Sequence, residues 1–219
     1  MNDKFNDLRN YLSQFDNQPK LTVEPSKYQR AIYNWIINGQ GNAMVNAVAG
    51  SGKTTTLLNS LDYMPTYQSK LFVAFNKSIA ENLGQKVGRK AVCKTIHALG
   101  YGMVRKYLRV SEIKIDYKKF NEGIKKGALA LRSYCPESEL LQIETTVSEA
   151  LKFCMVTLTN PVNIDSFREM IDYYQLDIMP NQMDAFGFVL QNLLEFGAKE
   201  ALDNKIINFD EMLYLPYLW

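Results

Sequence analysis

Apolar and polar positions in the first half of the chain alternate between the spacings of strands and helices. A helical pattern follows Pro25-Ser26, and three short apolar runs then have the length of strands, at 43–48, 71–75 and 91–93. A helical pattern comes after each of these runs. Successive strand–helix units predict a parallel sheet with right-handed crossovers, so this half is expected to be α/β.

The pattern changes at about residue 116. From there to about residue 205, apolar side chains recur at helical spacing and no strand is predicted. The breaks between the apolar stripes fall at Pro136, Pro161 and Pro180. An amphipathic leader helix is also predicted within residues 1–22. The sequence therefore predicts a small sheet region joined to an all-helical region.

Composition places the chain among globular proteins. Hydrophobic residues make up 47% and charged residues 22% of the sequence. No apolar run approaches the roughly 18 residues of a membrane span, and the first residues are too polar for a secretory signal. We therefore expect a cytoplasmic protein with no membrane partner. The three cysteines share no CxxC spacing, which predicts reduced thiols and no zinc site.

The net charge of +2 hides a strong segregation of charge. Residues 86–132 carry 13 basic and 3 acidic side chains, whereas residues 133–219 carry 4 basic and 14 acidic ones. A basic block of this density either pairs with the acidic block or meets a phosphate backbone, where each Lys or Arg releases a condensed counterion. The charge pattern favours nucleic acid as a partner.

The strongest chemical signal is the segment from Ala47 to Thr54, AVAGSGKT. It matches the phosphate loop GxxxxGK[ST], except that Ala47 replaces the first glycine. Backbone N–H groups of such a loop surround nucleotide phosphates, and the N-terminus of the next helix faces them. Lys53 is expected to reach the outer phosphates, and the Thr54 hydroxyl is expected to bind Mg²⁺. ATP with Mg²⁺ is therefore the expected cofactor.

The loop is part of a wider resemblance. The segments PSKYQRAI, AVAGSGKT, FVAFNKSIAENL and KTIHALG follow the motif order of UvrD/Rep-type superfamily I DNA helicases, and the chain most resembles their phage and F-box helicase branch. Near the end, INFDEMLYLP is similar to the segment that precedes the acidic DExx box of that family. The resemblance implies a partial RecA-like P-loop parallel sheet domain with an inserted all-helical subdomain, in a bacterial or phage-infected cytosol.

The implied organisation has four parts. They are a leader helix, a P-loop RecA-like core, a helical insertion and a return segment to the core, over residues 1–22, 23–112, 113–205 and 206–219.

The resemblance also implies nucleotide-binding roles. Gln29 matches the glutamine that hydrogen-bonds the adenine edge, the alternative being a surface glutamine on a helix. Lys53 matches the catalytic lysine, and Thr55 stands where many members have an arginine near the adenine. The implied nucleotide-binding residues are Gln29, Ala49, Gly50, Ser51, Gly52, Lys53, Thr54 and Thr55, with Thr54 as the Mg²⁺ ligand.

Two further segments match motifs that contact single-stranded DNA in the family. In the first, Phe75, Asn76 and Lys77, the aromatic ring is expected either to stack on a base or to belong to the core. In the second, Thr95 and His97, the histidine is expected to contact DNA, the alternative being a packed or capping ring. Single-stranded DNA is thus the implied partner.

The sequence stops at Trp219, before the acidic box, the arginine finger and the second motor domain that the resemblance implies for a complete 3′–5′ helicase. Asp210-Glu211 does not fit the acidic box, because the apolar run before it is short and the residues after it continue a helical pattern. We therefore expect the chain alone to bind ATP without hydrolysing it or unwinding DNA. The missing helicase part is then a candidate separate partner chain.

Two other functions remain open at this point. One is a regulatory or decoy module that binds nucleotide without turnover. The other is a small P-loop kinase, against which the helicase-like segments around Gln29, Asn76 and His97 argue.

Overall fold

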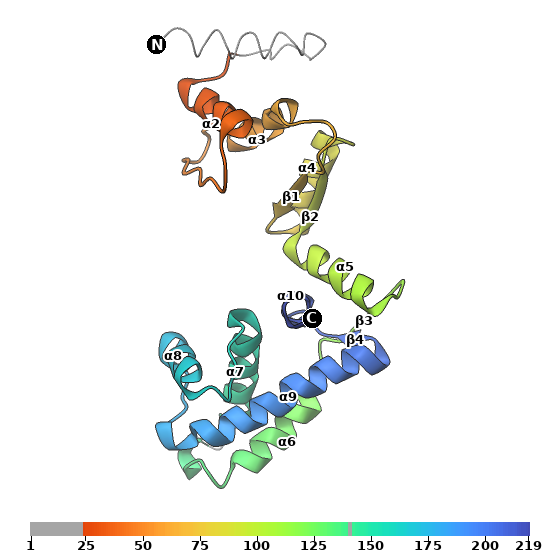
Figure 1. The fold of residues 1–219 in the computed structure, drawn as a ribbon. Coiled ribbons are helices and arrows are strands. Elements are labelled where there is room, and N and C mark those ends of the chain that lie inside the picture. Colours follow the sequence, from red (N-terminus) through yellow and green to blue (C-terminus); the bar gives the residue numbers. More distant parts are fainter. Residues whose placement is uncertain (1–23, 140–141) are drawn as a thin grey trace. The chain divides into compact units, whose positions relative to one another are not determined.

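The structure is a computed structural model that describes residues 24–139 and 142–219 (Figure 1). The chain divides into two compact units, with the boundary between Lys94 and Thr95. The leader helix expected over residues 1–22 lies outside the described residues. Among the residues that are described, no helix is both long and apolar enough to cross a membrane.

Helices and short strands alternate in the first unit. In chain order the elements are α2 (Lys27–Asn38), α3 (Lys53–Ser60), the 3₁₀ helix η1 (Leu61–Tyr63), β1 (Leu71–Ala74), α4 (Lys77–Val87) and β2 (Val92–Thr95). Strands β1 and β2 form a two-stranded parallel sheet, and α4 connects them. The strands predicted at 71–75 and 91–93 are therefore confirmed, as is the helix between them.

The strand predicted at 43–48 is wrong. These residues form an irregular segment before the phosphate loop, and the side chains of Met44 and Val48 are 96% and 77% exposed. A buried strand needs backbone partners at its edges and packing on its faces. Within the described residues, the sheet of this unit contains only β1 and β2, so the segment has neither.

The start of the first unit is held by packing between α2, α3 and η1. The rings of Tyr33 on α2 and Tyr63 on η1 stack, with centroids 4.5 Å apart. Burial raises the pKa of both tyrosines above the usual value of the phenol group. Thr56 and Ser60 are the buried residues of α3. This packing fixes α2 against the helix that follows the phosphate loop.

The second unit is almost entirely helical. Its elements are α5 (Ile96–Leu108), β3 (Lys114–Ile115), α6 (Asn121–Leu131), η2 (Glu137–Glu139), α7 (Ile143–Thr157), α8 (Ile164–Tyr174), η3 (Pro180–Gln182), α9 (Met183–Asn204), β4 (Ile206–Ile207) and α10 (Glu211–Leu218). The helical character predicted for residues 116–205 is confirmed for the described part of that range, and the three prolines fall between or at the ends of helices.

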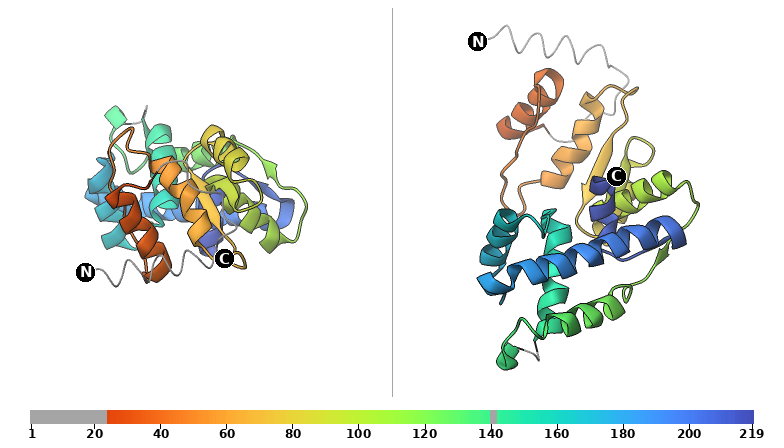
Figure 2. Two further views of the ribbon diagram at one scale, coloured as in Figure 1. Left: turned by 90° about the horizontal axis from the view of Figure 1, so that it is seen from above. Right: turned by 60° about the horizontal axis from the view of Figure 1, so that its bottom comes forward.

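The main core of the second unit lies among α6, α7, α8 and α9. Helix α9 is the longest of the described helices and runs beside α6 (Figure 1 and the right view of Figure 2). Phe167, Phe186 and Leu190 are fully buried between these helices. Each of these helices carries its apolar residues on one face, and the four faces point into a common interior.

Helices α5 and α10 form a second, smaller core. Contacts along α5 and the segment that contains α10 include three between residues 112 positions apart: His97 with Phe209, Gly100 with Met212 and Tyr107 with Trp219. The constant offset means that the two helices run in the same direction. A methyl group at Gly100 would lie 1.9 Å from the Met212 carbonyl oxygen, so the glycine permits this close approach.

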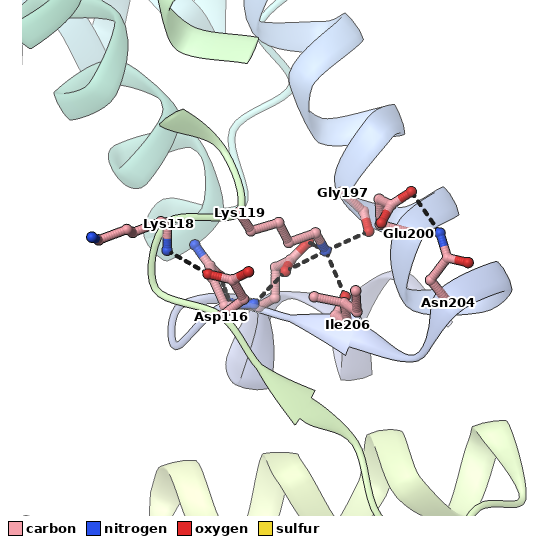
Figure 3. A network of polar contacts seen from close by, with 9 residues as sticks. Asp116, Lys118, Lys119, Gly197, Glu200, Asn204 and Ile206 are labelled. Carbon is pink, nitrogen blue, oxygen red and sulfur yellow. Dashed lines mark hydrogen bonds and ion pairs between the residues drawn. The ribbon is translucent and has the colours of Figure 1, made fainter. Parts of the chain in front are cut away.

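A buried ion pair joins the turn before α6 to the start of α10. Lys119, just before α6, donates hydrogen bonds to both carboxylate oxygens of Glu211, at 2.8 and 2.7 Å. Its ammonium group also donates to the carbonyl oxygens of Gly197 and Ile206, each at 2.8 Å (Figure 3). Both charged side chains are almost fully buried, at 2% and 1% exposed.

Glu211 is fixed on its other side by Asn208. The Asn208 backbone N–H donates to the Glu211 carboxylate at 2.7 Å, and the Asn208 side-chain oxygen accepts from the Glu211 N–H at 2.9 Å. These two hydrogen bonds close the turn that leads into α10. Burial lowers the pKa of Lys119 and raises that of Glu211, while each charge opposes the effect of burial on the other.

Candidate functional site

The phosphate loop adopts the backbone that its glycines allow. Gly50 and Gly52 have φ values of 76° and 81°, in the left-handed region where a side chain would be strained. Gly52 is the N-cap of α3, and its carbonyl accepts from the Thr56 N–H at 2.8 Å. The loop therefore leads directly into a helix whose N-terminal N–H groups are free of side-chain caps.

Lys53 is the first residue of α3, and its side chain folds back over the loop. The ammonium group donates to the carbonyl oxygens of Val48 at 2.7 Å and Ala47 at 3.1 Å. The Ser51 hydroxyl also donates to the Val48 carbonyl, at 2.8 Å. The lysine charge is thus held at the mouth of the loop, next to the backbone that would surround a phosphate.

Gln29 on α2 lies against the first turn of α3. Its amide nitrogen donates to the Thr56 hydroxyl at 3.0 Å, and its amide oxygen accepts from the Ser26 N–H at 2.9 Å, as part of the cap of α2. A primary amide has two N–H donors and two acceptor lone pairs. One donor and one acceptor of the Gln29 amide therefore remain for a ligand beside the phosphate loop.

The other predicted nucleotide-binding residues stay accessible. Ala49, Ser51, Thr54 and Thr55 are all exposed. Thr54 lies in the first turn of α3, beside Lys53, where its hydroxyl can reach a cation held by the phosphates. In the described part of the chain, no cluster of three or more His, Cys, Asp or Glu side chains could hold a metal by itself.

Phe75, Asn76 and Lys77 form the junction between β1 and α4. The Asn76 side chain caps α4 by accepting from the Ile79 N–H at 2.9 Å. The Phe75 ring is 94% exposed, so it is not part of the core of its unit. Lys77 is exposed and lies 3.7 Å from Glu81, one turn further along α4. An exposed ring next to an exposed cation is suited to contact a base and a phosphate.

Thr95 and His97 begin the second unit. The Thr95 hydroxyl caps α5 by accepting from the Ala98 N–H at 3.1 Å. The His97 ring stacks on Phe209, with centroids 4.0 Å apart and planes 19° from parallel. The packed-ring alternative thus describes His97 in this structure, although the residue remains partly exposed. These two residues and Phe75 to Lys77 belong to different units, and the structure describes them separately.

No sequence pattern indicated the Lys119–Glu211 pair. The two residues lie 92 positions apart, Lys119 in a turn before α6 and Glu211 at the start of α10. Glu211 is one of the acidic residues near the end of the sequence. Its carboxylate is bound by Lys119 and Asn208, so it is not free to hold a metal or a water molecule.

Comparisons with known proteins point to one class. The chain is 34% identical over 105 residues to F-box DNA helicase 1 of Gallus gallus, an alignment that covers 48% of this chain and 10% of the relative. It is 26% identical over 197 residues to F-box DNA helicase protein 1 of Schizosaccharomyces pombe, which covers 89% of this chain and 21% of the relative.

No family model and no solved structure matches the chain. The chain spans about a tenth to a fifth of the length of the relatives that it matches. The second alignment includes both the phosphate-loop unit and most of the helical unit, because it covers 89% of the sequence. Over that length the chain is similar to F-box DNA helicases.

Proposed function

We propose that this chain is the part of an ATP-dependent, UvrD/Rep-type DNA helicase that binds ATP and single-stranded DNA. The observation that carries the proposal is the phosphate loop: two glycines at positive φ lead into α3, with Lys53 at its mouth and Gln29 beside its first turn. The relatives are named DNA helicases, which supports the same class of function. A 3′–5′ direction in the complete protein is part of the proposal.

ATP binding follows from the chemistry of the loop. Backbone N–H groups at the start of α3 and the Lys53 ammonium attract the outer phosphates, and Thr54 ligates Mg²⁺. The remaining donor and acceptor of Gln29 suit the adenine edge. Lys53 must leave the Val48 and Ala47 carbonyls to reach a phosphate, so part of the binding energy offsets these lost hydrogen bonds. Weak affinity is therefore expected.

DNA binding is proposed to use the residues that match the helicase motifs. Phe75 and Lys77 are exposed beside each other, and Thr95 and His97 begin the helix of the basic block. For His97 to stack on a base, its ring would have to leave Phe209 or present its outer face. The many cations of residues 86–132 add long-range attraction for the phosphate backbone.

We further propose that this 219-residue chain binds ATP without appreciable turnover. Hydrolysis needs one carboxylate for Mg²⁺ and another group that positions the attacking water. Glu211 is engaged by Lys119, and Asp203 and Asp210 are the other acids near the end of the chain.

Calorimetry with Mg²⁺–ATP tests the nucleotide site. Lys53→Ala is expected to weaken binding at least tenfold, because it removes the charge nearest the outer phosphates. Lys86→Ala is the matched control, since Lys86 is an exposed lysine of the same unit at the far end of α4. Equal affinity of the Lys53→Ala chain and the parent would show that the loop does not bind the nucleotide.

Fluorescence anisotropy with a labelled deoxythymidine oligonucleotide tests the DNA site. Lys77→Ala is expected to lower the affinity and to make its dependence on salt less steep, because one phosphate contact is lost. Lys152→Ala, in the acidic part of the chain, serves as the control. An affinity that does not change between low and moderate salt would exclude phosphate contacts as the source of binding.

A further inference from the structure

Aromatic and basic side chains lie where α5 and α10 end. We call this surface the α5 platform. Its residues are the exposed Met103, Lys106, Tyr107 and Arg109 and the partly buried Trp219. Met103, Lys106 and Tyr107 are exposed and lie one helical turn apart, so they share a face of α5. None of the platform residues belongs to the segments that match helicase motifs.

The aromatic part of the platform is a preformed stack. The rings of Tyr107 and Trp219 lie with centroids 4.5 Å apart and planes 15° from parallel. More than half of Tyr107 remains exposed, at 54%. The α5–α10 pairing holds the two rings in place, because Gly100 brings the helices into backbone contact two turns earlier. A further flat ring could extend the stack without any rearrangement of the two helices.

The charged side chains at this end of α5 are basic, and the nearest acidic residue in the sequence is Glu112, three positions after Arg109. No acidic residue occurs between Glu81 and Glu112, whereas α5 and its cap carry Arg105, Lys106 and Arg109. The helix dipole accounts for a mild preference for cations at this end of a helix. Among the ion pairs within the described residues, none engages Lys106 or Arg109. Both cations therefore remain available to a negatively charged partner.

We propose that the α5 platform binds single-stranded nucleic acid, with a base stacked on the Tyr107–Trp219 pair and backbone phosphates at Lys106 and Arg109. Stacked aromatics beside cations are the combination that single-stranded nucleic acids require. A second protein surface would also cover exposed rings, but repulsion between the Lys106 and Arg109 cations of two copies disfavours a second copy of this face. The proposal rests on the proposed DNA-binding function and adds a second contact region to it.

The platform lies at the opposite end of α5 from Thr95 and His97, the residues that match a DNA-contacting motif. His97 and Tyr107 are ten residues apart on α5, which corresponds to about 15 Å along the axis. Single-strand binding sites commonly take about 4 to 16 nucleotides. One oligonucleotide can therefore contact Thr95 and His97 at the start of α5 and the platform at its end.

The two tryptophans of the chain make the test direct. In a Trp35→Phe chain, Trp219 is the remaining tryptophan, so its fluorescence reports on the platform alone. Titration with a deoxythymidine oligonucleotide is expected to quench this fluorescence saturably. Tyr107→Ala is expected to weaken binding about 5-fold or more, and Tyr107→Phe to retain it, because the phenyl ring preserves stacking. Replacing both Lys106 and Arg109 by Ala is expected to reduce the slope of log K against log salt by about 1.4.

Controls separate the possible outcomes. Tyr173→Ala removes another strongly exposed ring, on α8 in the acidic part of the chain, and is expected to leave binding unchanged. Failure of the parent chain to bind the oligonucleotide by anisotropy would contradict the proposed DNA-binding function itself. Binding without Trp219 quenching, and with equal affinity in Tyr107→Ala, would overturn only the platform. Self-association of the parent that Tyr107→Ala abolishes in sedimentation would assign the surface to a second copy and would also overturn it.

Discussion

The buried Lys119–Glu211 pair should couple strongly in a double-mutant cycle. Lys119→Met and Glu211→Met each leave one charged partner buried without its counterion. Breaking a buried ion pair on one side costs about 3–5 kcal/mol in the free energy of unfolding. Each single variant of this chain is expected to lose stability in that range.

The double variant should lose much less than the sum. It has no buried charge, but the carbonyl oxygens of Gly197 and Ile206 and the N–H of Asn208 lose their partners. At about 1 kcal/mol for each lost hydrogen bond, the double variant is expected to lose about 3 kcal/mol. The two single losses add to about 6–10 kcal/mol, so the coupling energy is expected to be about 3 kcal/mol or more.

Urea unfolding in the Trp35→Phe background measures this cycle, because Trp219 then reports on the second unit. The three variants and their parent are compared at one pH with a common slope of free energy against urea. Additive losses in the double variant would refute the reasoning, since they would show that the two charges do not interact. A single variant as stable as the parent would refute it equally.

The remaining predictions concern ionisation, packing and thiol access. Without Lys119, burial raises the pKa of Glu211 with less opposition, so the stability deficit of Lys119→Met should grow as pH rises from 4 to 7; urea unfolding at both pH values checks this. Gly100→Ala should destabilise the α5–α10 pair by about 1–3 kcal/mol, whereas Gly102→Ala, which meets nothing within 4 Å, should stabilise by about 0.5–1 kcal/mol; thermal unfolding compares them. Cys154 is buried and burial raises its pKa to about 12, so iodoacetamide at pH 8 should label it only after unfolding; mass spectrometry that finds it labelled in the folded chain would contradict the burial.

The helical unit could be predicted because its signal is local and repeated. Stripes such as those of α7 and α9 carry the same apolar spacing over many turns, and each helix packs by that stripe. Strands β3 and β4 have only two residues each, so no periodicity can reveal them. Their pairing depends on segments about 90 positions apart, which a local pattern does not contain.

Around the phosphate loop, the sequence predicted the following helix but not the structure of the preceding segment. The helix that begins at Lys53 could be predicted, because the two glycines of the motif permit the positive φ values that lead into it. The strand expected at 43–48 does not form, because an apolar run becomes a strand only where partners pair with it. His97 was expected to have two possible roles, and the ring of Phe209 decides its position in the structure.

Displacement of a fluorescent ATP analogue by unlabelled nucleotides tests the central claim most directly. A phosphate loop with Lys53 at its mouth holds the outer phosphates, so ATP and ADP should displace the analogue and AMP should not. The Lys53→Ala chain should show no saturable binding at concentrations that saturate the parent. Displacement by AMP as effective as by ATP, or unchanged binding in Lys53→Ala, would contradict the assignment of this loop as the ATP site.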